Sequence, residues 1–526
     1  MSSLPIKVLL ISMPDTVIGF NIAARLPNLG LVSIAANCHS NECEIKVLDL
    51  VLCRHAVLKC LKKALDKIKP EIVGISCMIF QYKTARNIAK WIKEKYNRNI
   101  TIVFGGYFPT VGFEYFGPYL SESENKIVDL KDHLNENPWC DFIVRGEGEV
   151  TFKEFIHEYI NDKNYSKVLG LSWRDEKGIF HHNLPRSNVD LNTLKLPDRN
   201  ARLIKSGFHN AGKPGDLIET SRGCTNMCKF CSIACMYGRT VRYYDLDRVI
   251  NEIKSLKKAG VKSILFIDDN ITINPERFEL LCDRIIKEKL KMEYHVQASV
   301  AGLLARSSLI PKMKKAGFSI VFFGIENADP RNLKFFRKSI PVKKIKYLVD
   351  QLHKNGMLTF GGFILGNPED DLKSFEYNFK FAKYLNLDIP AWQIITPFPK
   401  TETREELIQQ NLITNLNDFS KYDGLHANVK TKYLDSKTMD RELIRLYARY
   451  YTPQWFIRRL FMPRLWKFFP YTIHVGLKFA KYVLPAWKTL ISALKSKSEK
   501  ERIKKENIVI DFFNSVRKFR DKIIEF

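Results

Sequence analysis

The sequence is poor in cysteine and contains no long apolar run. Eleven cysteines in 526 residues are far fewer than a disulfide-stabilised secreted domain contains. No uninterrupted apolar stretch reaches the roughly 18 residues that a membrane span requires. The start of the chain, residues 1–7, lacks the cleavage pattern of a secretory signal peptide. We therefore expect a reduced, cytoplasmic protein.

Acidic residues are also scarce relative to basic ones. The chain has 57 Asp and Glu against 84 Lys and Arg, a net charge of +27. The excess is concentrated at the C-terminal end, where residues 441–526 hold 20 basic and 7 acidic residues. Such an excess indicates an anionic partner or a solvated, charged helix.

Residues 453–494, which we call the basic aromatic segment, interleave aromatic and basic side chains. This pattern is typical of helices at membrane interfaces, so contact with a membrane surface is one interpretation. A face that packs on the rest of the protein is a second. Nucleic-acid binding is a third, but no RNA-binding motif accompanies the segment, and we expect no nucleic-acid partner.

The length predicts about three domains of roughly 100–200 residues each. In the first third, short apolar runs alternate with segments of helical spacing. Such alternation predicts a parallel sheet with helices on both faces, that is, a doubly wound α/β domain. The predicted strands are 8–11, 45–50, 73–76, 100–104 and 142–144.

Small residues follow three of these strands, at the edge where parallel sheets bind ligands. Glycines there let backbone N–H groups approach a large flat or phosphate-bearing ligand. A single Gly-Gly turn is usually only a tight turn, whereas three such turns on one edge indicate a ligand site. The candidates are Ser76, Gly105, Gly106, Gly146 and Glu147.

The strongest signal is the spacing of Cys224, Cys228 and Cys231, Cys-x3-Cys-x2-Cys. Thiolates are soft ligands that suit iron–sulfur clusters. Three thiolates on one loop can bind three irons of a [4Fe–4S] cluster and leave the fourth iron open. Zinc with Cys235 as fourth ligand is the alternative, but no second Cys-x2-Cys pair follows. We expect Cys235 to be no ligand, because a fourth thiolate would block the open iron.

This spacing, with Phe230 directly before the last cysteine, resembles the radical S-adenosylmethionine (SAM) superfamily. In that family the open iron binds the methionine moiety of SAM, whose cleavage yields a 5′-deoxyadenosyl radical. The resemblance implies a partial (β/α)6 barrel over residues 210–425. Polar groups at the carboxyl ends of barrel strands are typical site residues. The resemblance places SAM contacts at Phe230, Asp268, Asp269, Glu326 and Gly366.

The first third resembles the cobalamin-binding domain that precedes many radical SAM barrels. The matching segments are 27–31, 105–110 and 141–149. The resemblance implies a flavodoxin-like cobalamin-binding domain over 1–160 and a connector over 161–209, in which 168–174 is predicted to be a hairpin strand. Phe108 stands where many relatives have histidine, and the loop 13–19 also lacks one. Cobalt would then be bound without a histidine ligand. The remainder, 426–526, is expected to be mainly helical.

Together these domains resemble the cobalamin-dependent radical SAM enzymes that include hopanoid methylases, phosphinate methylases and the anaerobic protoporphyrin ester cyclase. The resemblance implies three cofactors: a [4Fe–4S] cluster, SAM and cobalamin. It implies methylation of an unactivated carbon of a small-molecule or lipid-like substrate, with a reductase such as flavodoxin or ferredoxin. A lipid substrate would place the protein at the membrane surface.

Three alternatives stay open. Radical cyclisation, oxidation or ring contraction without methyl transfer uses the same two domains. A non-enzymatic cobalamin or iron–sulfur sensor is of another class. Methylthio transfer to tRNA would require three more cluster cysteines near the N-terminus. The six cysteines there fall mostly in predicted helices or strands, at positions 38, 43, 53, 60, 77 and 140.

Overall fold

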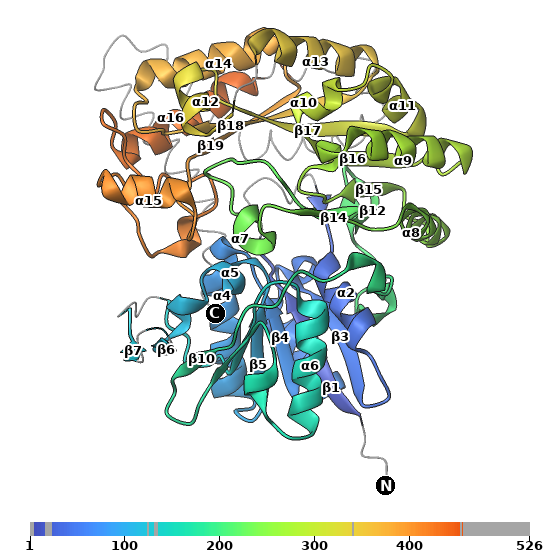
Figure 1. The fold of residues 1–526 in the computed structure, drawn as a ribbon, viewed down its shortest axis with the longest axis vertical. Coiled ribbons are helices and arrows are strands. Elements are labelled where there is room, and N and C mark those ends of the chain that lie inside the picture. The colour runs from blue at the N-terminus through green and yellow to red at the C-terminus, as the bar shows by residue number, and fades with distance from the viewer. Residues whose placement is uncertain are drawn as a thin grey trace.

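The computed structural model describes residues 5–15, 24–121, 123, 126–130, 135–338, 341–452 and 455. Each half of this chain is built on one large sheet, and the two halves are stacked along the long axis of the molecule (Figure 1). Apart from Trp455, the basic aromatic segment lies outside the described residues, so its contacts stay a prediction. Among the helices that the structure describes, none is long and apolar enough to cross a bilayer.

The N-terminal sheet begins with five parallel strands in the order β3-β1-β4-β5-β8. This flavodoxin-like order confirms the predicted doubly wound fold. Alternate residues of the central strand enter two cores: Leu9 and Ile11 pack with α3 and α4, whereas Val8 and Leu10 pack with α2 and α6. The elements are β1 (Ile6–Ser12), α2 (Leu29–Cys38), β3 (Cys43–Asp49), α3 (Val57–Ile68), β4 (Ile72–Ser76), α4 (Tyr82–Trp91), β5 (Thr101–Gly105), β8 (Phe142–Val144) and α6 (Gly148–Ile160).

Four further strands extend this sheet beyond β8. The first of them, β9 (Leu171–Arg174), runs antiparallel to β8 and forms a hairpin with β10 (Phe180–His182). The predicted hairpin strand therefore exists, and it joins the N-terminal sheet although it lies in the segment 161–209 that we expected to be a connector. The sheet ends with β6 (Tyr119–Ser121) and β7 (Lys126–Val128).

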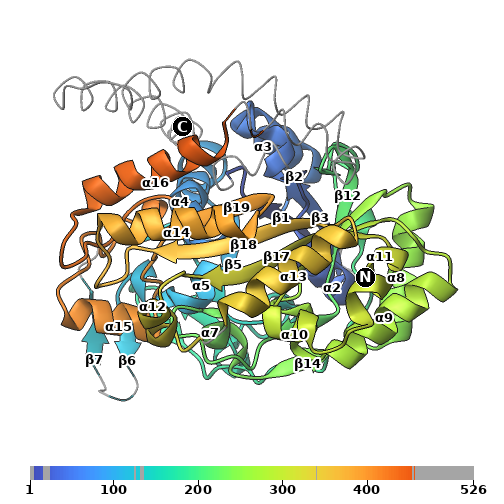
Figure 2. The same cartoon turned by 90° about the horizontal axis from the view of Figure 1, so that it is seen from above.

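The second sheet contains six parallel strands, which confirms the predicted partial (β/α)6 barrel. Viewed from above, helices of this half lie over the sheet (Figure 2). The strands are β12 (Lys213–Ile218), β15 (Ser263–Phe266), β16 (Glu293–Ala298), β17 (Phe318–Glu326), β18 (Leu358–Leu365) and β19 (Ile389–Ile394). The helices between them are α8 (Leu246–Lys258), α9 (Pro275–Lys287), α10 (Val300–Leu304), α11 (Leu309–Ala316), α12 (Pro330–Phe335), α13 (Val342–Lys354) and α14 (Leu372–Leu385).

Short elements complete the barrel half. The strand β11 (His209–Asn210) pairs with β12 and with β2 (Ala24–Arg25), which comes from the N-terminal half of the chain. After β19 the chain forms α15 (Glu402–Gln409) and then α16 (Ser436–Tyr450), which packs on α14 and β19. The helix α16 is the described part of the helical C-terminal region.

A small hairpin lies between the two large sheets. Its strands, β13 (Ser221–Gly223) and β14 (Val241–Tyr243), pair only with each other among the described strands. The loop that joins them, residues 224–240, contains the three clustered cysteines and α7 (Ile233–Tyr237). In Figure 1, α7 faces α5 (Tyr107–Val111) of the N-terminal half, and the two helices are in contact. We call β13 and β14 with their loop the cluster hairpin.

Candidate active site between the two domains

The glycine-rich edge of the N-terminal sheet is assembled as predicted from neighbouring strand ends. Ser76 and Gly105 are opposite each other in the register of β4 and β5. Gly106 has φ +92°, and a Cβ there would lie 2.8 Å from Ser76 Oγ. The turn therefore requires glycine.

Gly146 belongs to the same edge. Its N–H donates to Thr110 Oγ1 at 2.9 Å, and this hydroxyl donates to Gly106 O at 2.8 Å. A Cβ at Gly146 would meet no atom within 4 Å. The edge formed by Ser76, Gly105, Gly106 and Gly146, which we call the glycine rim, thus has open space beside Gly146.

The side chain of Glu147 points elsewhere. Its carboxylate accepts hydrogen bonds from Arg222 and Arg242, both on the cluster hairpin, at 2.9 Å each. The carboxylate is therefore engaged across the domain interface, and in this arrangement only the backbone of Glu147 faces the rim. The sequence identified the loop but not the partner of this residue.

The three clustered cysteines lie on one partly buried loop, and all eleven cysteines are free thiols. Burial, together with the neighbouring charges of Cys228 and Cys224, raises the pKa of Cys231 to about 11. Burial likewise raises the pKa of Cys228, to which Cys224 also contributes. The charges of the clustered cysteines thus act on one another's pKa values.

This donor set fits a [4Fe–4S] cluster better than zinc. Among the residues that the structure describes, no three His, Cys, Asp or Glu side chains are arranged around one ion. A cubane does not require that arrangement, since each thiolate binds a different iron. The Cys235 thiol donates to Lys400 O at 3.2 Å, so it is engaged with another loop.

The six N-terminal cysteines are packed into hydrophobic cores or beside them. Five are buried and Cys60 is partly buried. Burial raises the pKa values of Cys38, Cys43 and Cys140. They are therefore packing residues of the N-terminal half.

Asp268 and Asp269 follow β15 and bind the start of the cluster hairpin. Asp268 is buried and accepts hydrogen bonds from Thr220 Oγ1 at 2.7 Å and Ser221 Oγ at 2.6 Å. Burial raises the pKa of Asp268 to about 6. Asp269 accepts from Gly223 N at 2.8 Å. Both carboxylates therefore fix the chain that leads into Cys224, and Asp269, which is only partly buried, is the one placed nearer a ligand.

Glu326 ends β17 in a strained conformation. Its φ is +65°, and the pairing of β17 with β18 is irregular between Gly324 and Glu326. Its carboxylate forms an ion pair with Lys338. Backbone strain of this kind concentrates at functional sites.

Lys338 is a candidate site residue that the sequence did not single out. Its ammonium group lies 5.9 Å from the centre of the Phe230 ring. Burial acts to lower the pKa of Lys338, but the charges of Glu326 and Cys228 outweigh it and raise the pKa. A cation is thus held beside the cluster loop. The sequence did not predict it because the predicted site residues follow strands, whereas Lys338 follows helix α12.

Gly366 begins a rigid turn after β18. It has φ +79°, and its N–H donates to Asp370 Oδ2 at 2.9 Å. Asn367 donates to the same oxygen from its backbone at 3.0 Å. A Cβ at Gly366 would lie 3.1 Å from Met439 Sδ, so the turn packs closely on α16.

Tyr107 is a second residue that the sequence did not single out. It directly follows Gly106, and in the described structure its buried hydroxyl has no hydrogen-bond partner. Burial raises its pKa, and so do the nearby charges of Cys231, Cys235 and Asp269. A hydroxyl of the N-terminal domain therefore reaches the cluster loop. The only signal in the sequence was its position after Gly105-Gly106.

Comparisons with known proteins agree with this geometry. The profile of the radical SAM superfamily matches residues 218–382, and that of the B12 binding domain matches residues 16–117. An uncharacterized methyltransferase of Pyrococcus horikoshii is 31% identical over 459 residues, which cover 86% of this chain and 95% of the relative. An anaerobic magnesium-protoporphyrin IX monomethyl ester cyclase of Rubrivivax gelatinosus is 27% identical over 426 residues, 78% of this chain and 69% of the relative.

A solved structure shares the fold over nearly the whole chain. The cobalamin-dependent SAM radical enzyme OxsB, with aqua-cobalamin and SAM bound, superposes with a TM-score of 0.64 at 16% identity. The match covers 99% of this chain and 80% of OxsB.

The fold and the site define a radical SAM enzyme. More particularly, the chain belongs to the radical SAM enzymes that carry a B12-binding domain. This membership confirms the predicted family, the fold class and the three cofactors, and it makes the protein an enzyme rather than a sensor. The residues fit these groups, because three soft thiolates share one loop and the glycine rim is open at Gly146.

Proposed function

We propose that this enzyme transfers a methyl group to an unactivated carbon of a small organic substrate bound between its two domains. One observation carries the proposal: helix α5, which directly follows the glycine rim, is in contact with helix α7 of the cluster hairpin. When bound, the cluster and SAM supply a carbon-centred radical, and cobalamin supplies a transferable methyl group. Both chemistries then act on one enclosed space.

The residues of the chain have separable tasks in this proposal. Cys224, Cys228 and Cys231 hold the cluster. Lys338 and Asp269 offer a cation and an anion that complement the carboxylate and the ammonium of the methionine moiety of SAM. Tyr107 donates a hydrogen bond into the space between the domains. The contact between α5 and α7 excludes water from that space.

Further roles extend the proposal. Phe230, Glu326 and Gly366 line the SAM side, whereas Ser76, Gly105, Gly106, Gly146 and the backbone of Glu147 line the cobalamin side. The domain limits remain 1–160, 210–425 and 426–526, with 161–209 between the first two. We also propose a flavodoxin or ferredoxin as the electron donor, and a lipid-like substrate reached through the basic aromatic segment 453–494.

The test uses anaerobically purified protein, reconstituted with iron and sulfide and loaded with hydroxocobalamin. We expect about four irons and one cobalt for each chain. With dithionite and methyl-labelled SAM, label should enter a compound of a cell extract while 5′-deoxyadenosine forms. Cys231→Ala should abolish both, and its matched control Cys235→Ala should retain both.

Radical cyclisation is the second candidate, because the relative from Rubrivivax gelatinosus is named as a cyclase. It would yield 5′-deoxyadenosine without any transfer of label. The fraction of the extract that takes up label, lipid or water-soluble, decides whether the substrate is lipid-like. Absence of cobalt from the loaded protein would contradict both candidates.

A further inference from the structure

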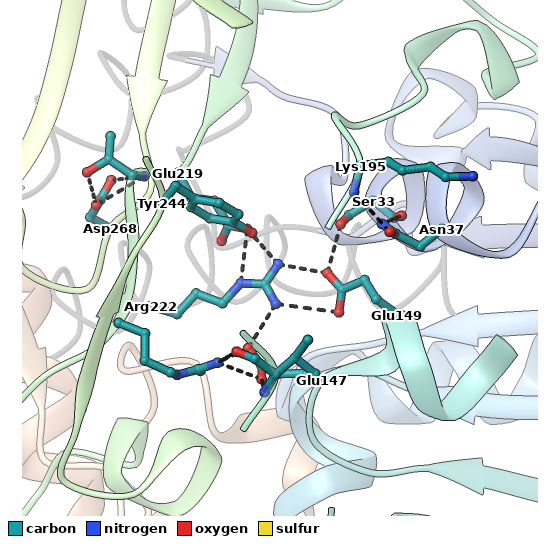
Figure 3. A network of polar contacts seen from close by, with 12 residues as sticks. Ser33, Asn37, Glu147, Glu149, Lys195, Glu219, Arg222, Tyr244 and Asp268 are labelled. Carbon is teal, nitrogen blue, oxygen red and sulfur yellow. Dashed lines mark hydrogen bonds and ion pairs between the residues drawn. The ribbon is translucent and has the colours of Figure 1, made fainter. Parts of the chain in front are cut away.

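The cluster hairpin is joined to the N-terminal domain by buried charges. Arg222 on β13 is opposite Arg242 on β14 in the hairpin register. The guanidinium group of Arg222 points toward Glu147 and Glu149 of the N-terminal domain (Figure 3), and that of Arg242 donates to Glu147. Arg222 stands two residues before Cys224, so any displacement of its backbone is passed to the first cluster ligand.

Two carboxylates receive the arginines: Glu147, which caps α6, and Glu149 in the first turn of that helix. Arg222 forms ion pairs with Glu147 at 2.9 Å and with Glu149 at 2.7 Å. Arg242 forms a second ion pair with Glu147, at 2.9 Å. The side chains of Arg222, Glu147 and Glu149 are only 7%, 6% and 4% exposed. We call Glu147 and Glu149 the carboxylate clamp.

The clamp is continuous with the glycine rim. Glu147 is the residue after Gly146, whose flank is open. Glu149 also accepts a hydrogen bond from Ser33 Oγ of α2 at 2.7 Å. The backbone N–H of Val189 donates to Glu147 at 2.8 Å. The clamp is therefore also held by two other segments of chain, α2 through Ser33 and the connector 161–209 through Val189.

The barrel side fixes the arginines equally well. Glu219, which precedes the hairpin, accepts a hydrogen bond from Arg222 at 2.6 Å, and the Tyr244 hydroxyl donates to Glu219 at 2.7 Å. Every charge in this set has a partner of opposite sign or a hydrogen bond. Buried ion pairs add little net stability compared with apolar packing, but they are sensitive to orientation. We therefore expect these ion pairs to fix the orientation of the cluster hairpin rather than to add stability.

We propose that Glu147 and Glu149 are positioning residues of the radical reaction, which set the place and environment of the cluster from the cobalamin domain. A ligand that occupies the open flank of Gly146 then displaces the clamp, and Arg222 transmits that displacement to Cys224. The cluster senses whether the other domain is loaded. The sensing of a bound ligand rests on the proposed function, because that function identifies the ligand as cobalamin. The positioning role of Glu147 and Glu149 does not depend on it.

The experiment compares the full chain with reconstituted cluster in four forms: wild type, Glu147→Gln, Glu149→Gln and Glu154→Gln. Glu154 is the matched control, since it lies on the same helix α6 but forms an outer ion pair with Arg186 and is 44% exposed. Electron paramagnetic resonance of the dithionite-reduced cluster is recorded with SAM, before and after hydroxocobalamin is added. Iron content and 5′-deoxyadenosine formation are measured in parallel.

We expect wild type and Glu154→Gln to show the same spectrum and the same shift on adding hydroxocobalamin. Glu147→Gln and Glu149→Gln should keep their iron but show an altered spectrum without cobalamin and lose the shift. Their rate of 5′-deoxyadenosine formation should fall about tenfold, as for a misplaced reacting group. Glu147→Asp retains the negative charge and should therefore recover part of the spectral shift on adding hydroxocobalamin. If Glu147→Gln loses iron, Glu147→Asp is compared with wild type in its place.

Spectra of the two clamp variants that match wild type, with and without hydroxocobalamin, would overturn the proposal. So would a loss of signal that is the same in Glu147→Asp and Glu147→Gln, since that marks a steric and not an ionic role. Failure of the proposed function is seen separately. In that case wild type transfers no methyl label, while its cluster spectrum still differs from that of Glu147→Gln.

Discussion

At the residue scale, the hydroxyl of Tyr107 is the most informative group of the site. It is buried and has no hydrogen-bond partner in the described structure. An unsatisfied buried hydroxyl costs about 1–3 kcal/mol. A protein retains such a cost when the missing partner is a ligand, because the hydrogen bond then forms only in the loaded state.

Tyr107→Phe should therefore change stability and function in opposite directions. The thermal unfolding midpoint of the ligand-free protein should rise or stay constant, while 5′-deoxyadenosine formation should slow about tenfold, the value of one hydrogen bond to a ligand. Tyr447→Phe is the control, because the Tyr447 hydroxyl donates to Trp392 O at 2.7 Å. That variant should lose about 1 kcal/mol of stability and retain activity. A lower midpoint with unchanged activity in Tyr107→Phe would contradict the interpretation.

The carboxyl group of Asp268 makes stability depend on pH. Burial raises its pKa to about 6 from an ordinary value of 3.8. A group with a raised pKa in the folded state binds its proton more tightly there than in the unfolded chain. Its stabilising contribution is therefore complete below about pH 4 and is lost as the pH rises through about 6.

The stability of ligand-free wild type relative to Asp268→Asn should accordingly be greater at pH 5 than at pH 7.5. The expected difference is about 1 kcal/mol, since one pKa unit corresponds to about 1.4 kcal/mol. Urea unfolding of both proteins at the two pH values measures it. A relative stability that does not change with pH would show that the pKa of Asp268 is ordinary.

At the scale of elements, the turn after β5 determines the glycine rim. Gly106 has φ +92°, and an added Cβ would lie 2.8 Å from Ser76 Oγ and 3.2 Å from Cys77 N. Gly260, after α8, has a similar φ of +85°, but a Cβ there would meet nothing within 4 Å. An alanine at either position would adopt an unfavourable positive φ. Only at Gly106 would its Cβ also collide with neighbouring atoms.

Gly106→Ala should weaken hydroxocobalamin binding at least about tenfold, because the strand ends must separate to admit the methyl group. Gly260→Ala should cost about 1 kcal/mol of stability and leave cobalamin binding unchanged. Titration followed by the visible spectrum measures both affinities. Equal losses in the two variants would mean that backbone strain alone matters and that the rim is no cobalamin site.

At the scale of the whole molecule, the two cofactor sites belong to different sheets (Figure 1). The cysteines are on the cluster hairpin, and the glycine rim ends the N-terminal sheet. The N-terminal sheet lies between two hydrophobic cores, and the barrel sheet packs mainly on a third. Loading of the two sites is therefore expected to be separable, even though their environments are coupled.

Cys224→Ala should lose iron and still bind one hydroxocobalamin for each chain. Gly106→Ala should retain iron while it binds cobalamin weakly. Iron and cobalt analysis after gel filtration distinguishes these outcomes. If Cys224→Ala also lost cobalt, the cobalamin site would depend on the cluster hairpin rather than on the N-terminal sheet.

Much of the fold was predictable from local sequence pattern. The predicted strand 142–144 coincides with β8, and the predicted strand 73–76 begins one residue after β4. Such segments are determined by the spacing of their own apolar residues, since that spacing selects helix or strand. The three cysteines were equally evident, because the chemistry of the cluster requires them on one short loop.

The partners of the site residues were not predictable in this way. Arg222 lies 75 residues from Glu147 in the sequence, and neither position has a local pattern that names the other. The same holds for Lys338 beside Phe230 and for Tyr107 beside Cys231.

The sequence by itself thus determined the elements, their order in two α/β units and the spacing of the three proposed cluster ligands, because each depends on interactions between near neighbours in the chain. The tertiary structure alone decided that Glu147 binds arginines and that Asp268 holds the start of the cluster hairpin. It also decided that β9 and β10 join the N-terminal sheet. These outcomes depend on burial and on the pairing of charges between distant segments, which exist only after the two domains have packed together.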